Sequence, residues 1–149
     1  YDFLIGNPKT ALAEPNTVVL TEPVAAKIFG KQSAINQVVR ISNSIGTIDY
    51  RVTGVVKKPN NPSHLNGHFF MSLYSGELGT YVREETNMAN NNIFFTYIRL
   101  KPGTNAAALE QKFPAFMEKY AKEDLAAAGF SKKEFLVPAT DIHLHTDLG

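Results

Sequence analysis

Two histidines close to the C-terminus are the residues whose type and spacing could hold a metal ion. His143 and His145 are two positions apart, and Asp141 and Asp147 flank them at the same interval. On a β-strand, side chains two positions apart point to the same face, so the ring nitrogens of such a pair can converge on one ion. The same alternation also describes an ordinary strand with one polar and one apolar face. The pattern therefore leaves open both a metal site and a solvent-exposed strand face.

The other polar residues that could do chemistry have no partner at a useful spacing. His64 and His68 are four positions apart, as metal ligands on a helix can be, but the Asn-Gly pair between them disfavours a helix. On an extended strand the same two residues would lie about 13 Å apart. Glu84, Glu85 and Asp49 have no neighbour in the sequence that would tune a carboxyl group for acid–base catalysis. Nucleophile-elbow and nucleotide-binding motifs do not occur, so these two functions lack the motifs they need, and we expect no cofactor.

The composition is that of a globular domain and excludes several classes of function. Of the 149 residues, 44% are hydrophobic and 19% are charged, which suits a single core or two small ones. The 15 basic and 14 acidic residues give a net charge of +1, so nucleic acid is not an expected partner. The lack of cysteine excludes thiol catalysis, disulfides and cysteine-ligated zinc. No apolar run approaches the roughly 20 residues of a membrane-spanning helix.

The first part of the chain predicts short strands around one short helix. Residues 17–20 are β-prone and lead into Thr21-Glu22-Pro23, a threonine, an acid and a proline that indicate the start of a helix. Gly30 is suited to end that helix. The other expected elements are strands at 37–41 and 50–56 joined by a loop at 42–47, and a further strand at 68–74.

The second part of the chain predicts one longer helix between β-prone segments. Residues 75–92 are expected to be an exposed connection, with weak helical character at 81–86. An amphipathic helix should begin at Asn105, and Pro114 should bend or restart it. Strands are expected at 93–100, 134–137 and 141–148. These elements lack a βαβ rhythm, so we expect an α+β fold of mostly antiparallel short strands with two or three helices.

The order of several motifs matches a known family. Residues 14–30, EPNTVVLTEPVAAKIFG, match a strand that enters a helix ending in Phe-Gly, and residues 35–41 match the strand that follows. Residues 50–56, YRVTGVV, match a strand of the pattern Tyr-x-Val-x-Gly-Val-Val. Shorter matches lie at 61–65, 97–103 and 138–144. Together these segments resemble the periplasmic core domain of MacB-like, FtsX-type ABC transporter permeases, particularly those of Bacteroidetes type.

Two departures from the family pattern affect what can be expected of the fold. The family's Pro-Ile-Gly-Lys turn is replaced by residues 34–37, Ala-Ile-Asn-Gln, which keep only the isoleucine. The family domain also begins earlier, with a strand and a helix that follow the first membrane helix, whereas Tyr1 starts after them. We therefore expect residues 1–149 to be a segment of a longer protein, with part of the fold absent or supplied by another segment.

The resemblance implies a non-enzymatic extracytoplasmic domain located at the periplasmic face of the bacterial inner membrane. It implies a β-rich lobe at about residues 15–92 and a mixed α/β lobe to which the chain returns at about residues 93–149. The implied partners are a cytoplasmic ATPase subunit, reached through the membrane part, and a periplasmic adaptor, a lipoprotein or a second copy of the domain. ATP hydrolysis would drive export, lipoprotein handling or envelope signalling through conformational change. His143 and His145 would then be solvent-facing residues near the second membrane helix.

Two alternatives of other classes remain open. A freestanding periplasmic module could bind a ligand or protein through exposed aromatic residues such as Tyr81, Phe94 or Tyr97, which would otherwise be core residues. A metal-dependent enzyme could be built around His143 and His145, and it would need a further ligand to hold the ion.

Overall fold

The computed structural model describes residues 1–43, 46–58, 66–89 and 93–142. Five strands and five helices lie in this part of the chain, and none of these helices is long and apolar enough to cross a membrane. The expected α+β class with mostly antiparallel strands is confirmed, although there are more helices than the expected two or three. The chain divides into two compact units, Tyr1–Glu85 and Thr86–Gly149.

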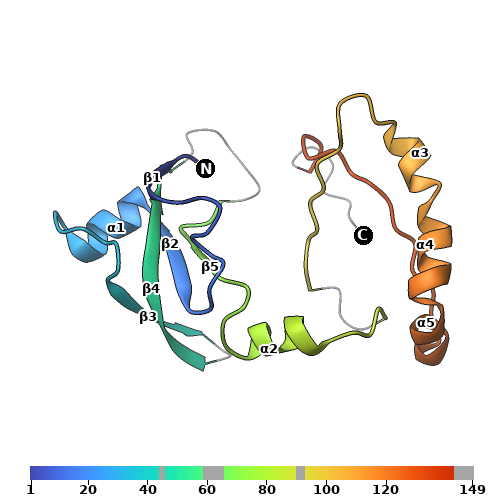
Figure 1. Cartoon of the computed structure of the whole chain (residues 1–149), viewed down its shortest axis with the longest axis horizontal. Helices are drawn as coiled ribbons and strands as arrows, with labels where there is room; N and C mark the ends of the chain where they lie inside the picture. Colours follow the sequence, from blue (N-terminus) through green and yellow to red (C-terminus); the bar gives the residue numbers. More distant parts are fainter. Residues whose placement is uncertain (44–45, 59–65, 90–92, 143–149) are drawn as a thin grey trace. The chain divides into compact units, whose positions relative to one another are not determined.

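The first unit contains the sheet and two helices (Figure 1). Its strand order is β1-β4-β2-β5, and β3 also pairs with β4. In chain order, the elements are β1 (Phe3–Gly6), β2 (Thr17–Thr21), α1 (Glu22–Phe29), β3 (Val38–Asn43), β4 (Gly46–Val56), β5 (Phe69–Met71) and α2 (Gly76–Glu84).

The longest strand, β4, organises this sheet. β3 is antiparallel to the first half of β4, and β1 is antiparallel to its end, where Phe3 lies opposite Val56. β2 is parallel to β4, with Val18 opposite Val52, and β5 is antiparallel to β2. A parallel pair needs a crossover connection, and the chain provides one by passing through α1 and β3 before it returns as β4.

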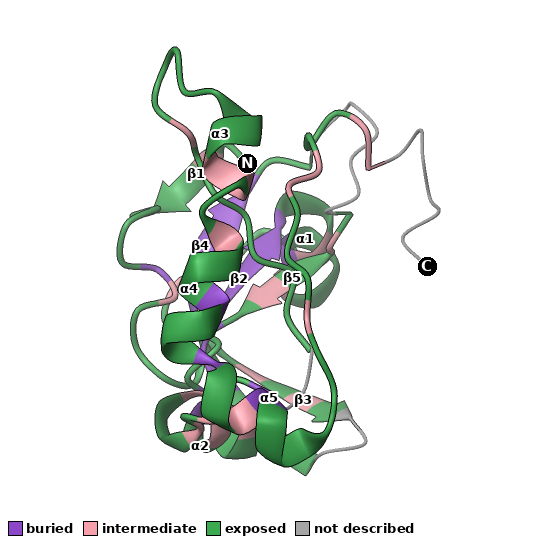
Figure 2. Ribbon diagram, turned by 90° about the vertical axis from the view of Figure 1, so that its right-hand side faces the viewer, coloured by how far each residue is buried: buried purple, intermediate pink, exposed green. Residues whose placement is uncertain are grey.

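The core of the first unit lies on both faces of β2, whose five residues are all buried (Figure 2). Alternate side chains of a strand point to opposite faces. Val18 and Leu20 therefore join one cluster, together with Ala25 of α1 and Tyr50, Val52 and Val55 of β4. Val19 joins another, with Ala11 and Val56. Burial on both faces explains why β2 is a continuous run without polar alternation.

Helix α1 begins and ends where the sequence indicates. Thr21 occupies the N-cap position, Pro23 lies in the first turn, and Gly30 ends the helix with a φ of 62°. The Thr21 side chain makes no capping hydrogen bond to the helix. Its hydroxyl donates instead to the backbone oxygen of His68, at 2.9 Å. The threonine therefore joins the end of β2 to the segment that precedes β5.

The second unit contains three short helices: α3 (Ala106–Glu110), α4 (Phe113–Tyr120) and α5 (Lys122–Ala128). The Asn105 side chain caps α3 by accepting a hydrogen bond from the backbone N–H of Ala108, at 3.1 Å. Pro114 lies in the first turn of α4, so the expected restart of the helix at this proline is confirmed. A small core joins the helices to the segment before them, and it consists of Ala89, Met117, Ala121 and Leu125.

Two expected strands are not formed, and a third lies mostly outside the described residues. Residues 93–100 and 134–137 have no regular secondary structure and pair with no strand among the described residues, so these two predictions are wrong. Asp141 and Ile142, at the start of the third, lie in a turn, and residues 143–148 are outside the described part of the chain. β-Propensity describes how well a residue fits an existing sheet, and it cannot supply the neighbouring strand.

Other elements also differ from the expected ones in their presence or their bounds. β1 was not expected, α2 occupies part of the expected connection at 75–92, and β5 is shorter than the expected strand at 68–74. The hairpin strands extend into the expected loop at 42–47, since β3 continues to Asn43 and β4 begins at Gly46. Continued cross-strand pairing there overrides the turn preference of the individual residues.

Candidate interaction surface

The suspected metal site lies mostly outside the described residues, which end at Ile142 before His143 and His145. Asp141 is described, and its backbone N–H donates to the oxygen of Pro138 at 2.9 Å. Its carboxylate accepts a hydrogen bond from the hydroxyl of Thr140 at 3.1 Å. Within the described ranges, no group of three or more histidine, aspartate or glutamate side chains could hold a metal ion.

The remaining polar candidates are not brought together. The His68 side chain is exposed, and its backbone oxygen accepts hydrogen bonds from the amide and the hydroxyl of Thr21. His64 lies outside the described residues. Glu84 is exposed in the last turn of α2, and the next residue, Glu85, ends that helix.

Asp49 forms a two-bonded ion pair with Arg40 across the β3–β4 hairpin. Arg40 Nε and Nη2 donate to the two carboxylate oxygens at 2.6 and 2.8 Å. These hydrogen bonds hold the pKa of Asp49 below its ordinary value, because they stabilise the charged form. Both side chains are exposed, so the pair is a solvated surface feature and not a catalytic acid.

Side chains on α3 and α5 accept hydrogen bonds from two non-helical segments of the second unit. Glu110 Oε1, on α3, accepts a hydrogen bond from the backbone N–H of Leu136 at 2.6 Å. On α5, Asp124 Oδ2 accepts one from the N–H of Met88, also at 2.6 Å. Lys132 Nζ donates to the backbone oxygen of Met88 at 3.0 Å and so connects these two segments. Sequence analysis missed these contacts because the partners are far apart along the chain.

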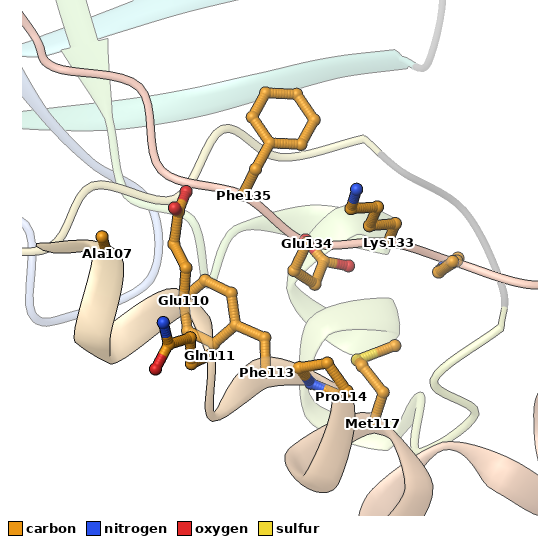
Figure 3. A pocket seen from close by; sticks show the side chains of 10 residues that line it. Ala107, Glu110, Gln111, Phe113, Pro114, Met117, Lys133, Glu134 and Phe135 are labelled. Carbon is orange, nitrogen blue, oxygen red and sulfur yellow. The ribbon is translucent and has the colours of Figure 1, made fainter.

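A hollow of about 470 Å³ lies between α3, α4 and residues 132–135 (Figure 3). Apolar atoms of Phe113, Pro114 and Met117 line much of it, and charged side chains of Glu110 and Lys133 also contribute. In Figure 3 the Phe135 ring points away from α4, in agreement with its 61% exposure. Its lining also includes Lys132 and Glu134, and it holds no serine, cysteine or histidine.

Exposed aromatic residues are concentrated at residues 93–98, in the part of the second unit that precedes α3 in the chain. Phe94 is 47% exposed and Tyr97 51%, so neither is a core residue. Phe95, which was not singled out from the sequence, is 84% exposed. Its position in the apolar run 93–95 is the sequence feature that could have identified it as a candidate contact residue. Tyr81, the third aromatic candidate, is half-buried on α2 and belongs to the first unit.

Comparisons with known proteins give a family and a related fold. The model of the MacB-like periplasmic core domain matches residues 1–116. The fold resembles a solved structure described as "a domain of a putative permease protein from Porphyromonas gingivalis", with a TM-score of 0.57 and 18% sequence identity. The match covers 80% of this chain and 52% of that one, so the chain spans about half the length of the matched structure. No curated protein matches the sequence. Since the family model matches well over half of the chain, this protein belongs to the family of MacB-like periplasmic core domains.

Proposed function

We propose that this chain is a non-enzymatic domain of an ABC transporter permease that couples ATP hydrolysis in the cytoplasm to work in the periplasm. The observation that carries the proposal is the family match over residues 1–116. Tag-free protein titrated with Zn²⁺ in a calorimeter should accordingly show no stoichiometric binding, and a 1:1 isotherm lost in His143→Ala would contradict this.

The proposed mechanism is a conformational change and involves no chemical step in this domain. A cytoplasmic ATPase subunit would bias the membrane helices, and those helices would shift this domain between two states. Export, lipoprotein handling and envelope signalling are the processes that such movement could serve. A periplasmic adaptor, a lipoprotein or a second copy of the domain would receive the movement. The division of the chain into two compact units is compatible with such a change.

The first test is to read the native gene on both sides of this segment. We expect an apolar stretch of roughly 20 residues upstream of Tyr1 and another downstream of Gly149. A cleavable signal peptide with no membrane span on either side would overturn the permease assignment.

The coupling itself can be tested by electron–electron distance measurements in the full-length transporter. The chain contains no cysteine, so spin labels can be attached at introduced cysteines alone, once any cysteines elsewhere in the transporter are replaced. Ala26→Cys on α1 and Ala127→Cys on α5 place one exposed label in each unit. Trapping the ATP-bound state should change the distance distribution between them. A control pair within the first unit, Ala26→Cys with Thr47→Cys, should keep its distribution, and an unchanged distribution for the first pair would count against coupling.

A freestanding binding module is the second candidate, and the exposure of Phe94, Phe95 and Tyr97 favours it. Exposed aromatic residues at the centre of a contact contribute much of its binding energy. This alternative requires that the native protein be secreted without membrane spans, so the reading of the gene separates it from the permease assignment.

A further inference from the structure

Asn66 and Gly67 form a reactive pair that the proposed function does not use. Both residues lie outside helices and strands, shortly before β5, and Asn66 is exposed to solvent. The amide carbon of an asparagine side chain lies within reach of the backbone nitrogen of the next residue, and attack by that nitrogen closes a five-membered ring. Glycine in the second position hinders the attack least, because it has no Cβ. Asn66 is the only asparagine of the chain that precedes a glycine, so the sequence there is that of a deamidation site.

The two groups that would react are not engaged elsewhere. Among the residues that the structure describes, the Asn66 side chain makes no hydrogen bond and the backbone N–H of Gly67 donates to no acceptor. Other asparagine side chains are held in place. Those of Asn7, Asn87 and Asn105 each accept a hydrogen bond from a backbone N–H two or three residues further along the chain. A side chain fixed in this way cannot turn freely toward the next backbone nitrogen, so Asn66 differs from these three in structure as well as in sequence.

Packing in the first unit leaves no room for a side chain at Gly67. A Cβ added there would lie 2.9 Å from a ring carbon of Phe70, closer than real Cβ atoms approach other atoms. The Phe70 ring packs in turn against the buried cluster of Ala11, Val19 and Val56. A residue with a Cβ would slow the ring closure, but it would also have to displace this aromatic ring. The fold therefore favours the residue that makes Asn66 reactive.

We propose that Asn66 is a site of spontaneous deamidation and that the isoaspartate formed there loosens the attachment of β5 to β2. The Gly67 nitrogen loses its proton and bonds to Asn66 Cγ, and the side-chain amide leaves as ammonia, which gives a cyclic imide. Water then opens the imide at one of its two carbonyl carbons. Cleavage of the bond from the Gly67 nitrogen to Cγ gives aspartate. Cleavage of the bond from that nitrogen to the backbone carbonyl carbon gives isoaspartate, in which the chain runs through the former side chain.

The effect on β5 follows from the contact that His68 makes two residues after Asn66. The backbone oxygen of His68 accepts hydrogen bonds from the amide and the hydroxyl of Thr21, at 3.0 and 2.9 Å. Thr21 is 1% exposed and lies where β2 ends and α1 begins. Isoaspartate adds one carbon to the backbone just before this contact, so it should shift His68 relative to Thr21 and weaken both hydrogen bonds. Aspartate adds the same negative charge but leaves the length of the backbone unchanged.

Peptide mapping by mass spectrometry, on protein incubated at neutral pH, tests the modification. Asn66 should be converted at least about tenfold faster than Asn105, whose side chain caps α3 and which precedes a residue with a Cβ. Raising the pH by about one unit should accelerate the conversion about tenfold, because the attacking nitrogen must be deprotonated. Asn66→Gln keeps an amide but would have to close a six-membered ring, so it should abolish conversion at this position. Conversion of Asn66 at the rate of Asn105 would overturn the proposal.

Hydrogen exchange at the Thr21 amide tests the structural consequence. In the isoaspartate form, which electron-transfer fragmentation distinguishes from the aspartate form, this amide should exchange about tenfold faster than in unmodified protein. Asn66→Asp is the matched control, because it carries the same charge on a backbone of normal length, and it should leave the rate nearly unchanged. Equal rates in the isoaspartate form and the unmodified protein would contradict the proposed loosening, and so would an equally large increase in Asn66→Asp. Neither measurement depends on the permease assignment.

Discussion

At Gly6 the backbone of β1 leaves no room for a side chain. Its φ is +101°, and a Cβ added there would lie 2.5 Å from the backbone oxygen of Thr53. Gly30, at the end of α1, also has a positive φ of +62°, but a Cβ there would meet nothing within 4 Å. Substitutions at these two glycines therefore distinguish the cost of backbone strain from the cost of steric overlap.

We expect Gly6→Ala to destabilise the first unit by at least about 3 kcal/mol, because strain and overlap with backbone atoms add. Gly30→Ala should cost about 1 to 3 kcal/mol from backbone strain alone, because its φ of 62° and ψ of −119° form a conformation that residues with a Cβ rarely adopt. Urea unfolding followed by circular dichroism measures both values. Equal losses for the two variants would show that β1 can shift away from β4 to admit the methyl group.

The ion pair between Arg40 and Asp49 makes a second prediction at the scale of single residues. The hydrogen bonds from Arg40 lower the pKa of Asp49 below its ordinary value of 3.8. Any stability that the pair contributes is therefore fully present above pH 3.8 and is lost as the pH falls through the lower pKa of the folded state. An NMR pH titration of the Asp49 carboxyl carbon should give a midpoint below 3.8 in the parent protein and a higher one in Arg40→Gln. Identical midpoints would mean that the pair does not persist in solution.

At the scale of elements, the hydrogen bond from Leu136 to Glu110 is what attaches the segment after α5 to α3. The acceptor is a charged carboxylate in a partly buried position, and hydrogen bonds of this type are among the stronger ones in proteins. Gln111 lies next to Glu110 and also lines the hollow, but it is exposed, so it provides a matched control.

Glu110→Ala should increase the exchange rate of the Leu136 amide about tenfold, because that amide loses its acceptor and the segment can detach. Gln111→Ala should leave the rate nearly unchanged, and Glu110→Gln, which retains an acceptor oxygen, should have an intermediate effect. Residue-resolved hydrogen exchange by NMR provides the rates. If Gln111→Ala has the same effect as Glu110→Ala, the segment is held by the general packing of α3 and not by the hydrogen bond between Leu136 and Glu110.

At the scale of the whole molecule, each buried cluster among the described residues lies within one unit. Two clusters include strand β2 and belong to the first unit, and the cluster around Met117 belongs to the second. Leu20 is 2% exposed in the first unit, and Leu125 is 9% exposed in the second. These two leucines allow the same chemical change to be made in each core.

We expect Leu20→Ala to destabilise the first unit by about 2 to 5 kcal/mol and to leave exchange in α4 and α5 nearly unchanged. Leu125→Ala should do the reverse and leave β2 and β4 protected. Hydrogen exchange followed by mass spectrometry reports both units in one experiment. A substitution that weakens both units equally would show that they unfold as one cooperative body.

The family resemblance and the local elements were determined by the sequence itself. The motifs at 14–30 and 50–56 lie in the range matched by the family model. The first predicts the strand β2 and the helix α1, which starts after Thr21 and ends before Gly30, and the second predicts a strand that is the end of β4. Pro114 likewise marked the restart of a helix. Such signals are local, because a proline or a glycine constrains the backbone at its own position.

Only the tertiary structure decided which β-prone segments become strands and which polar groups meet. Residues 50–56 and 93–100 both have strand-like sequences, yet among the described residues only the first belongs to the sheet, because sheet formation depends on neighbouring strands from elsewhere in the chain. The contact between Glu110 and Leu136 and the burial of β2 on both faces arise in the same way. A sequence states what each segment can do locally, whereas the partners that satisfy its backbone and cover its side chains are brought to it by the fold.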